Sequence, residues 1–196
     1  MDAHKIDELK GLIKKQAIVV DINGITLSSG EKSQYYYDLK KVMFDPVGIN
    51  LIADLMFEEI TLKGAKSVGG LEIGAIPITT AILAKSAKEH PLDGFVVRKH
   101  AKGHGLKYSV EGNLKPPVVI VDDVLTTGES LKKAIDEVMK SKNVSVKYVF
   151  CILDRENENN VLKQGHSPYT SLCKHSDFKP FIDAEIERQK AQKIQA

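Results

Sequence analysis

The stretch VVIVDDVLTTGES, residues 118–130, holds the side chains best suited to chemistry. Its β-branched start predicts a buried strand, and the carboxylates of Asp122 and Asp123 follow at the carboxyl end. Gly128 then leads into a predicted helix, whose first amides lack partners and attract phosphate. Paired carboxylates suit vicinal sugar hydroxyls or a hydrated Mg²⁺. The order of these features indicates a site for phosphate and sugar hydroxyls.

The same residues also have a purely structural interpretation. Thr126 and Glu129 have the spacing of a capping box, with which any helix can begin. Acidic residues are also common at strand ends. Each feature alone is more typical of structure, whereas the complete order of strand, acids, threonines, glycine and helix favours binding.

A second candidate is the basic stretch RKHAKGHG, residues 98–105. Between Arg98 and Lys107 there are four positive charges, and the first acid after them is Glu111. Like charges without partners repel each other, and the connection up to Pro116 is longer than most loops in compact domains. These features predict a loop that binds an anion and closes over it. A solvated basic loop is the alternative.

The composition excludes several classes of protein. With 196 residues, 42% of them hydrophobic, the chain is long enough for one globular domain. A net charge of +2 is too small for a protein that coats nucleic acid. No apolar run reaches the roughly 18 residues of a membrane span, and the start lacks signal-peptide features, so we expect a cytoplasmic protein. Cys151 and Cys173 lack metal-site spacing and are expected to be reduced core residues.

Helix and strand patterns alternate along the chain. Helices are predicted over residues 2–16, 45–64, 75–88, 128–141 and 179–194. Strands are predicted over residues 66–70, 93–99, 116–123 and 144–154. An Asn23-Gly24 turn is predicted to join two further short strands near the N-terminus.

The predicted fold class is α/β, an open, doubly wound, mainly parallel sheet with helices on both faces. The predicted core strands are apolar on both faces, which is typical of such a sheet. Residues 1–196 are expected to form a single domain, with a small helix-and-hairpin subdomain over 1–44, a core over 45–165, and a strand and helix over 166–196. Ligands bind such sheets beyond the carboxyl ends of the strands.

Residues 118–130 resemble the phosphoribosyl-pyrophosphate (PRPP) binding motif of type I phosphoribosyltransferases. The resemblance implies that family's fold, with PRPP bound by the core. It implies that Asp122 and Asp123 hold the ribose hydroxyls, while the following loop wraps the 5′-phosphate. Mg²⁺ is then the cofactor, held mainly through PRPP with these two acids nearby. The residues assigned to PRPP in this stretch are Asp122, Asp123, Val124, Leu125, Thr126, Thr127, Gly128, Glu129 and Ser130.

The pattern R-K-x-x-K-x-H-G of the basic loop resembles the catalytic loop of orotate phosphoribosyltransferases. The resemblance implies that Arg98 and Lys99 contact pyrophosphate, with Lys102 and His104 on the part of the loop that closes. In that family the loop closes over the neighbouring subunit's active site, so a homodimer is implied. The residues assigned to catalysis are Arg98, Lys102, His104, Asp122 and Asp123.

Two other places resemble the base site of the same family. In TLSSGEKSQYYYDLK, residues 26–40, Tyr36 and Tyr37 take the place of an aromatic pair near orotate. Arg155, in ILDRE, takes the place of an arginine that binds orotate, and a guanidinium fork fits a planar carboxylate. Thr126 is expected to touch orotate as well. Ordinary strand packing is the alternative for the tyrosines, and a surface ion pair for the arginine.

The segment VGGLEIGAIPITTA, residues 68–81, resembles the family's pyrophosphate loop, and its turn carries Glu72, Ile73 and Gly74. Many members have a lysine in this loop, and this chain has none. Ser28 also stands where some members carry a PRPP-binding lysine. In the catalytic loop, His100 and Gly103 replace acids that the family often has. From these departures we expect altered kinetics with activity retained.

The predicted function is the transfer of a phosphoribosyl group from PRPP to orotate, which gives orotidine 5′-monophosphate and pyrophosphate in pyrimidine (UMP) biosynthesis. The expected partners are these substrates and a second copy of the chain, with no nucleic acid and no membrane. One alternative is a PRPP- or nucleotide-sensing regulator on the same fold, against which the complete catalytic loop argues. The other is a transferase for another base.

Overall fold

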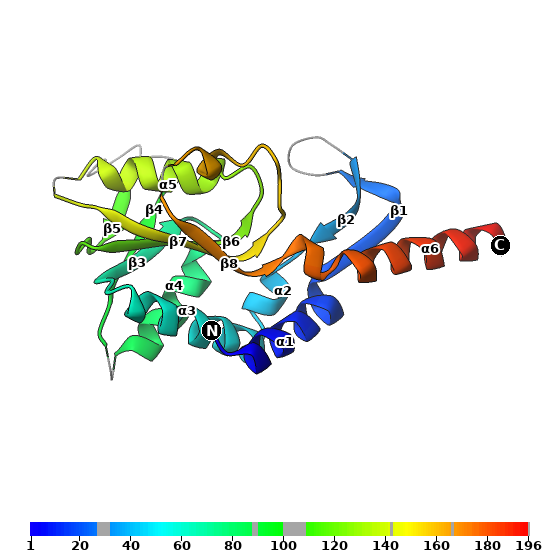
Figure 1. Cartoon of the computed structure of the whole chain (residues 1–196), viewed down its shortest axis with the longest axis horizontal. Helices are drawn as coiled ribbons and strands as arrows, with labels where there is room; N and C mark the ends of the chain where they lie inside the picture. Colours follow the sequence, from blue (N-terminus) through cyan, green and yellow to red (C-terminus); the bar gives the residue numbers. More distant parts are fainter. Residues whose placement is uncertain (27–31, 88–89, 100–108, 142, 166, 196) are drawn as a thin grey trace.

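A mixed six-stranded sheet forms the centre of the computed structural model (Figure 1). The structure describes all residues except 27–31, 88–89, 100–108, 142, 166 and 196. In spatial order the strands are β5 (Val110–Gly112), β4 (Asp93–Val97), β3 (Ser67–Leu71), β6 (Val118–Leu125), β7 (Val146–Asp154) and β8 (Tyr169–Lys174). Neighbouring strands are parallel, except that the short edge strand β5 runs antiparallel to β4. The predicted parallel sheet is confirmed, whereas β5 lies in a segment predicted to be loop.

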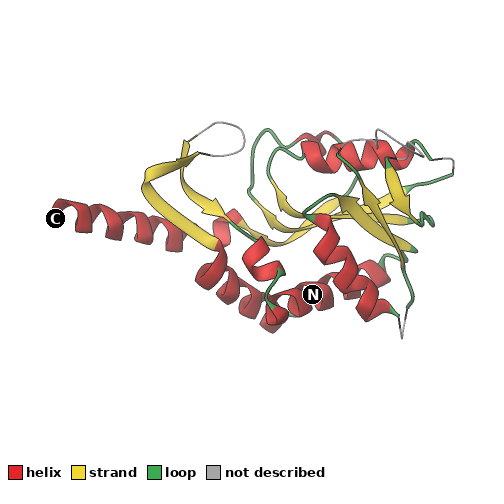
Figure 2. Cartoon of the chain, turned by 180° about the vertical axis from the view of Figure 1, so that it is seen from behind, coloured by secondary structure: helices red, strands yellow, loops and turns green. Residues whose placement is uncertain are grey.

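Helices cover both faces of this sheet, as the apolar strands predict (Figures 1 and 2). Successive side chains of a strand point to opposite faces. Val119 and Val121 of β6 accordingly pack into the core beside α3 (Pro46–Leu62) and α4 (Ala75–Ser86). Val118 and Ile120 pack into a second core beneath α5 (Glu129–Met139). Because both faces are dry, the strand has no polar position until its carboxyl end.

Helix α3 begins and ends where its sequence predicts. Asp45 caps it, since its Oδ1 accepts hydrogen bonds from the amides of Val47 and Gly48, both at 2.9 Å. Gly64, just past the end, has a φ of 68°, a conformation that glycine adopts without strain.

The N-terminal segment forms a helix and a two-stranded hairpin. Helix α1 (Ala3–Leu12) continues into a π-helical turn (Ile13–Ala17), and β1 (Ile18–Thr26) pairs antiparallel with β2 (Lys32–Tyr37). A short helix, α2 (Lys40–Met43), leads into α3.

The predicted Asn23-Gly24 turn is wrong, because β1 runs through it. Gly24 has a φ of 95°, and the register of the pair shifts between Val20 and Ile25. The positive φ therefore serves an irregularity within the strand. The connection between the two strands falls on residues 27–31, outside the described residues.

The C-terminal helix lies against the hairpin (Figure 1). After β8, a 3₁₀ turn (His175–Asp177) leads into α6 (Lys179–Gln195). Gln189 makes two hydrogen bonds to the β1 backbone, donating to the carbonyl of Val20 at 3.0 Å and accepting from the amide of Ile22 at 3.4 Å. Lys193 donates to Asn23 Oδ1 at 2.9 Å. Helix α6 thus braces the strand whose partner, β2, carries the tyrosines.

Two observations bear on the exclusions drawn from the composition. Cys151 and Cys173 are free and buried, as predicted, and burial raises the pKa of the Cys173 thiol to about 12. Across the described part of the chain, the helices are all too short or too polar to cross a bilayer.

Candidate active site

The strand order of the sheet reverses between β3 and β6, and the predicted site residues meet there. From β3 the chain proceeds to β4 on one side, whereas β6 is followed by β7 on the other. In doubly wound sheets, ligands bind at such a switch point beyond the carboxyl ends of the strands. A Cβ added at Gly74, after β3, would lie 2.6 Å from Asp122 Oδ1 and 2.7 Å from Asp123 Oδ1. The predicted pyrophosphate loop therefore touches the paired acids of β6.

The paired acids at the end of β6 differ in burial. Asp122 is 7% exposed, and its Oδ1 accepts a hydrogen bond from the amide of Asp123 at 2.9 Å. Burial, and then the charge of Asp123, raises the pKa of Asp122 to about 8, while Lys99 lowers it. The folded chain therefore favours the protonated form of Asp122 more than water does. A protonated carboxyl group can both donate to and accept from a sugar hydroxyl.

A hollow of about 350 Å³ lies between these acids and the start of α5. Gly128 is the N-cap residue of α5, with a φ of 80°, and no side chain caps the helix. The capping-box alternative for Thr126 is therefore not found, and the first amides of α5 face the hollow without a side-chain cap. This arrangement suits a phosphate group. The lining residues are Asp122, Val124, Thr126, Thr127, Gly128, Glu129, Ser130 and Leu131.

The acids alone do not make a metal site. In the chain outside the masked segments, no three His, Cys, Asp or Glu side chains form a group that could hold an ion. Mg²⁺ prefers six oxygen ligands and keeps several waters. A cation beside Asp122 and Asp123 would therefore take most of its ligands from a bound molecule and from water, and the two acids fit that arrangement.

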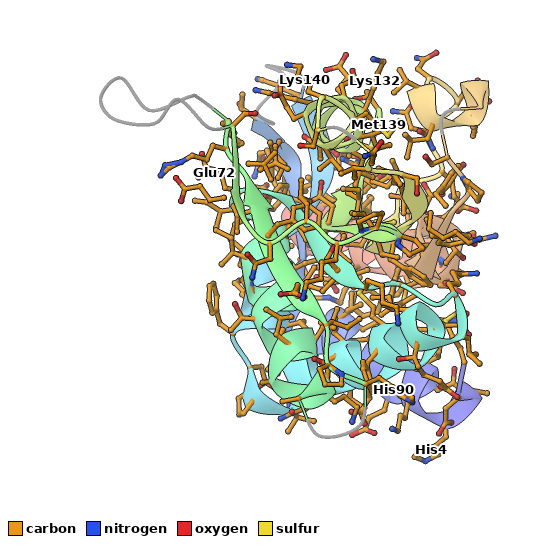
Figure 3. The ribbon with its side chains drawn as sticks, turned by 90° about the vertical axis from the view of Figure 1, so that its left-hand side faces the viewer. His4, Glu72, His90, Lys132, Met139 and Lys140 are labelled. Carbon is orange, nitrogen blue, oxygen red and sulfur yellow. The ribbon has the colours of Figure 1, made fainter. Side chains whose placement is uncertain are left out.

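The described part of the basic loop is tied to the pyrophosphate loop and to α5. The amide of Lys99 donates to Glu72 Oε1 at 2.9 Å, and Lys133 of α5 donates to the carbonyl of Lys99 at 2.7 Å. Glu72 lies at the same end of the molecule as α5 (Figure 3). Arg98 pairs with Glu111 of β5, with Nε 3.3 Å from Oε1. The loop therefore starts beside Gly74 and the acids.

Two of the predicted catalytic residues, Lys102 and His104, lie outside the described residues, as do His100 and Gly103. Ser28, where some members of the resembled family carry a lysine, lies outside them as well.

Arg155 connects the phosphate hollow to the tyrosines of β2. Its amide donates to the carbonyl of Leu125 at 2.9 Å, which fixes its backbone beside the end of β6. Its guanidinium carbon lies 5.2 Å from the ring centre of Tyr35 and 6.0 Å from that of Tyr37. Tyr36, predicted to act with Tyr37, points to the other face of β2 and is 38% exposed. The structure thus brings Tyr37 and Arg155 together, and separates them from the Tyr36 ring.

Comparison with known proteins identifies the family. Residues 69–180 match the phosphoribosyl transferase domain family. The orotate phosphoribosyltransferase of Aquifex aeolicus is 41% identical over 178 residues, which cover 88% of this chain and 96% of that protein. The chain belongs to the orotate phosphoribosyltransferase family. The orotate phosphoribosyltransferase of Rhodopseudomonas palustris BisB18 is 43% identical over 162 residues, covering 79% of this chain and 86% of the relative.

Solved structures of orotate phosphoribosyltransferases share the architecture. The Mycobacterium tuberculosis enzyme in complex with PRPP superposes with a TM-score of 0.72, at 31% identity, over 89% of this chain and 99% of that one. The same enzyme with Fe(III) dicitrate gives a TM-score of 0.75 at 33% identity, over 88% of this chain and 98% of that one. The type I phosphoribosyltransferase fold predicted from the sequence is thereby confirmed.

The structure adds two residues to the predicted orotate phosphoribosyltransferase site. Tyr35 lies on the same face of β2 as Tyr37, and the two-residue period of a strand is the signal that could have found it. His175, in the turn after β8, lies with its Nδ1 2.8 Å from the Tyr37 hydroxyl and its ring stacked on Tyr35. No sequence signal joins His175 to a residue 138 positions earlier.

Proposed function

We propose that this chain transfers the 5-phosphoribosyl group of PRPP to orotate, forming orotidine 5′-monophosphate and pyrophosphate in pyrimidine biosynthesis. The observation that carries the proposal is that the four predicted parts of the site are neighbours in the fold. These parts are the pyrophosphate loop, the paired acids, the phosphate hollow and Arg155. Gly74 touches the acids, and the amide of Arg155 is bonded to Leu125. The relatives named as orotate phosphoribosyltransferases, and the solved complex of one of them with PRPP, support it.

The 5′-phosphate is assigned to the hollow at the start of α5. The free amides there, and the hydroxyls of Thr126, Thr127 and Ser130, can donate to phosphate oxygens. The ribose hydroxyls are assigned to Asp122 and Asp123. This places C1 of the ribose toward Gly74 on one side and Arg155 on the other.

The departing pyrophosphate is assigned to the backbone around Gly74 and to the side chains of Arg98 and Lys99. Both residues directly follow β4; Arg98 pairs with Glu111 in the structure, and Lys99 is close enough to Asp122 to lower its pKa. Cations fixed in advance stabilise charge that develops in the transition state, which here forms on pyrophosphate. Mg²⁺, when bound, would offset the same charge. Lys102 and His104 are proposed to act on this group as well.

The base site is assigned to Arg155 and the tyrosines. A guanidinium fork suits the carboxylate of orotate, and an aromatic face suits its planar ring. Thr126, which lines the phosphate hollow, remains a predicted contact of orotate. The role of Tyr36 also stays a prediction from the resemblance. We further propose that the chain acts as a cytoplasmic homodimer in which each basic loop serves the partner's site.

A base-by-base assay tests the reaction. With PRPP and Mg²⁺, orotate should be converted, whereas uracil, hypoxanthine and adenine should not. Conversion of another base in place of orotate would contradict the assignment, and no conversion of any of the four would favour the regulator.

The variant Arg155→Leu tests the base site. It should lower kcat/KM for orotate on the order of 10²-fold, as expected for loss of one preorganised donor group. Arg188→Leu is the matched control, because Arg188 is an exposed arginine of α6, paired with Glu185. Equal kcat/KM values for the two variants would remove Arg155 from the proposed site.

A further inference from the structure

Three distant segments form one compact cluster beside the proposed base site. Strand β2 contributes Tyr35 and Tyr37, the end of β7 contributes Arg155, and the turn after β8 contributes His175. The His175 ring lies parallel to Tyr35, with ring centres 5.2 Å apart and planes at 12°. Its Nδ1 lies 2.8 Å from the hydroxyl of Tyr37. His175 thus contacts both tyrosines, Tyr35 through its face and Tyr37 through its edge.

The bond to His175 matters because Tyr37 is buried. Tyr37 is 4% exposed, and burial raises the pKa of its hydroxyl, which therefore stays protonated. A buried hydroxyl without a hydrogen-bond partner destabilises the arrangement that holds it. Phe178 contacts the Tyr37 ring edge-on, with centres 6.0 Å apart, and offers no such partner. His175 therefore fixes the direction in which the Tyr37 hydroxyl points.

Arg155 rests on the aromatic surface that His175 organises. Its guanidinium lies over Tyr35 and Tyr37, and a cation over a ring face is attracted by the ring quadrupole. Burial, and then the charge of Arg155, lowers the pKa of His175. The other charges that act on His175 come from Glu156, Lys179 and Asp183. The lowered pKa favours the neutral form of His175 beside the guanidinium of Arg155.

We propose that His175 is a positioning residue for the base subsite, which holds Tyr37 by a hydrogen bond and Tyr35 by stacking, so that Arg155 presents its guanidinium to the carboxylate of a planar base. The proposal rests on the proposed function. It assigns His175 no contact with the phosphates or the ribose, and it therefore concerns binding of the base alone.

Three substitutions separate the two contacts of His175. His175→Asn keeps a hydrogen-bonding atom near the position of Nδ1 and removes the ring. His175→Phe keeps a ring for stacking and removes the bond. His175→Ala removes both. We expect KM for orotate to rise about tenfold in His175→Ala, as for a buried hydroxyl that loses its partner. The rise should be smaller in the other two, while kcat and KM for PRPP stay within about twofold of wild type.

A double-mutant cycle tests the bond itself. If the His175 bond acts through the Tyr37 hydroxyl, then adding Tyr37→Phe to His175→Phe should raise KM for orotate no further. If the two substitutions act independently, their increases in KM for orotate will multiply in the double variant. That outcome would show that the bond between His175 and Tyr37 is not the cause of the increase.

The control is His4→Asn, because His4 is an exposed histidine of α1, remote from α5 and Glu72 (Figure 3). It should leave all constants at wild-type values. Circular dichroism identifies any variant that fails to fold; if His175→Ala does so, His175→Asn and His175→Phe carry the test.

The outcomes separate the two proposals. A wild-type chain that makes no orotidine 5′-monophosphate overturns the proposed function and, with it, the role of His175. An active wild type whose His175 variants keep the orotate KM, or raise both KM values alike, overturns the role of His175 alone.

Discussion

The phosphate hollow and the aromatic cluster are built in different ways. The hollow is lined by one stretch of chain, residues 122–131, and depends on backbone amides and on the conformation of Gly128. The cluster comes from Tyr35, Tyr37, Arg155 and His175, and it depends on side chains that meet through the fold.

This difference separates the phosphate-binding part of the site, which depends on the backbone, from the proposed base-binding part, which depends on individual side chains. A helix start that binds phosphate leaves little freedom in sequence, because the backbone itself must approach the ligand. A surface made of side chains from three segments can change one residue at a time. A fold that hosts several related reactions can therefore keep the phosphate-binding helix start and vary the surface made of side chains.

The largest effect is expected from a change to the backbone of the hollow. A Cβ on Gly128 would lie 2.7 Å from Asn160 Oδ1, at a φ of 80°. Gly128→Ala should therefore displace the start of α5 and lower kcat/KM for PRPP on the order of 10²-fold. Gly165→Ala is the matched control, since Gly165 also has a positive φ, 94°, but open space around it. Steady-state kinetics should show the loss in the first variant alone.

The next effect concerns the free energy of unfolding, which the buried carboxyl group of Asp122 should lower as the pH rises. The pKa of Asp122 in the folded chain, about 8, lies above its ordinary value of 3.8. The folded state therefore prefers the protonated form, and stability should fall as the pH rises from about 4 to about 8. Asp122→Asn cannot ionise, so above pH 8 its free energy of unfolding should exceed that of wild type, at about 1.4 kcal/mol for each unit by which folding raises the pKa of Asp122. Its activity should be lost. Near pH 4 the difference should vanish.

Urea unfolding at the two pH values measures this difference. Asp136→Asn, which removes an exposed carboxylate of α5 paired with Lys132, should show no such gain. A gain for Asp122→Asn that is equal at both pH values would contradict burial of an ionisable group as its cause.

A smaller effect should distinguish the two faces of β2. Tyr35 shares its face with Tyr37 and Arg155, whereas Tyr36 points away from them. We expect Tyr35→Leu to raise KM for orotate about fivefold, since an aromatic contact contributes about 1 kcal/mol. Tyr36→Leu should raise it less. The reverse order would favour Tyr36, which the sequence resemblance assigns to the base site together with Tyr37.

The smallest effect is expected where the basic loop begins. Lys133 holds the carbonyl of Lys99, whereas its neighbour Lys132 pairs with Asp136 along α5. Lys133→Met should lower kcat about threefold, because an exposed hydrogen bond of this kind contributes little. Lys132→Met, one position away on the same helix, should leave kcat unchanged. Equal kcat values for the two variants in steady-state assays would show that Lys133 does not position Lys99.

Most of the fold and the whole hollow could be predicted from the sequence because their signals are local. Each of these signals specifies the structure of residues only a few positions away. Examples are the strands that are apolar on both faces, the Asp45 cap and the order of residues 118–130. The Asn23-Gly24 prediction failed because a positive φ suits a strand irregularity as well as a turn. Local preference could not distinguish the two, and the pairing of β1 with β2 decided between them.

The base site was predictable only in part. The family resemblance located Arg155 and the tyrosine segment, but it could not say which rings face the guanidinium. That depends on the pleat of β2 and on the arrival of His175 from the far end of the sheet. Contacts across such separations leave no periodic trace in a single sequence.

The bonds between Gln189 and the β1 backbone connect helix α6 to the hairpin of the proposed base site. Helix α6 supports β1 through these bonds, and β1 pairs with the tyrosine-bearing strand β2. We therefore expect a truncation of α6, or a fusion to its C-terminal end, to change the preference among bases while the affinity for PRPP stays the same. Comparisons of selectivity between versions of this chain need identical C-termini.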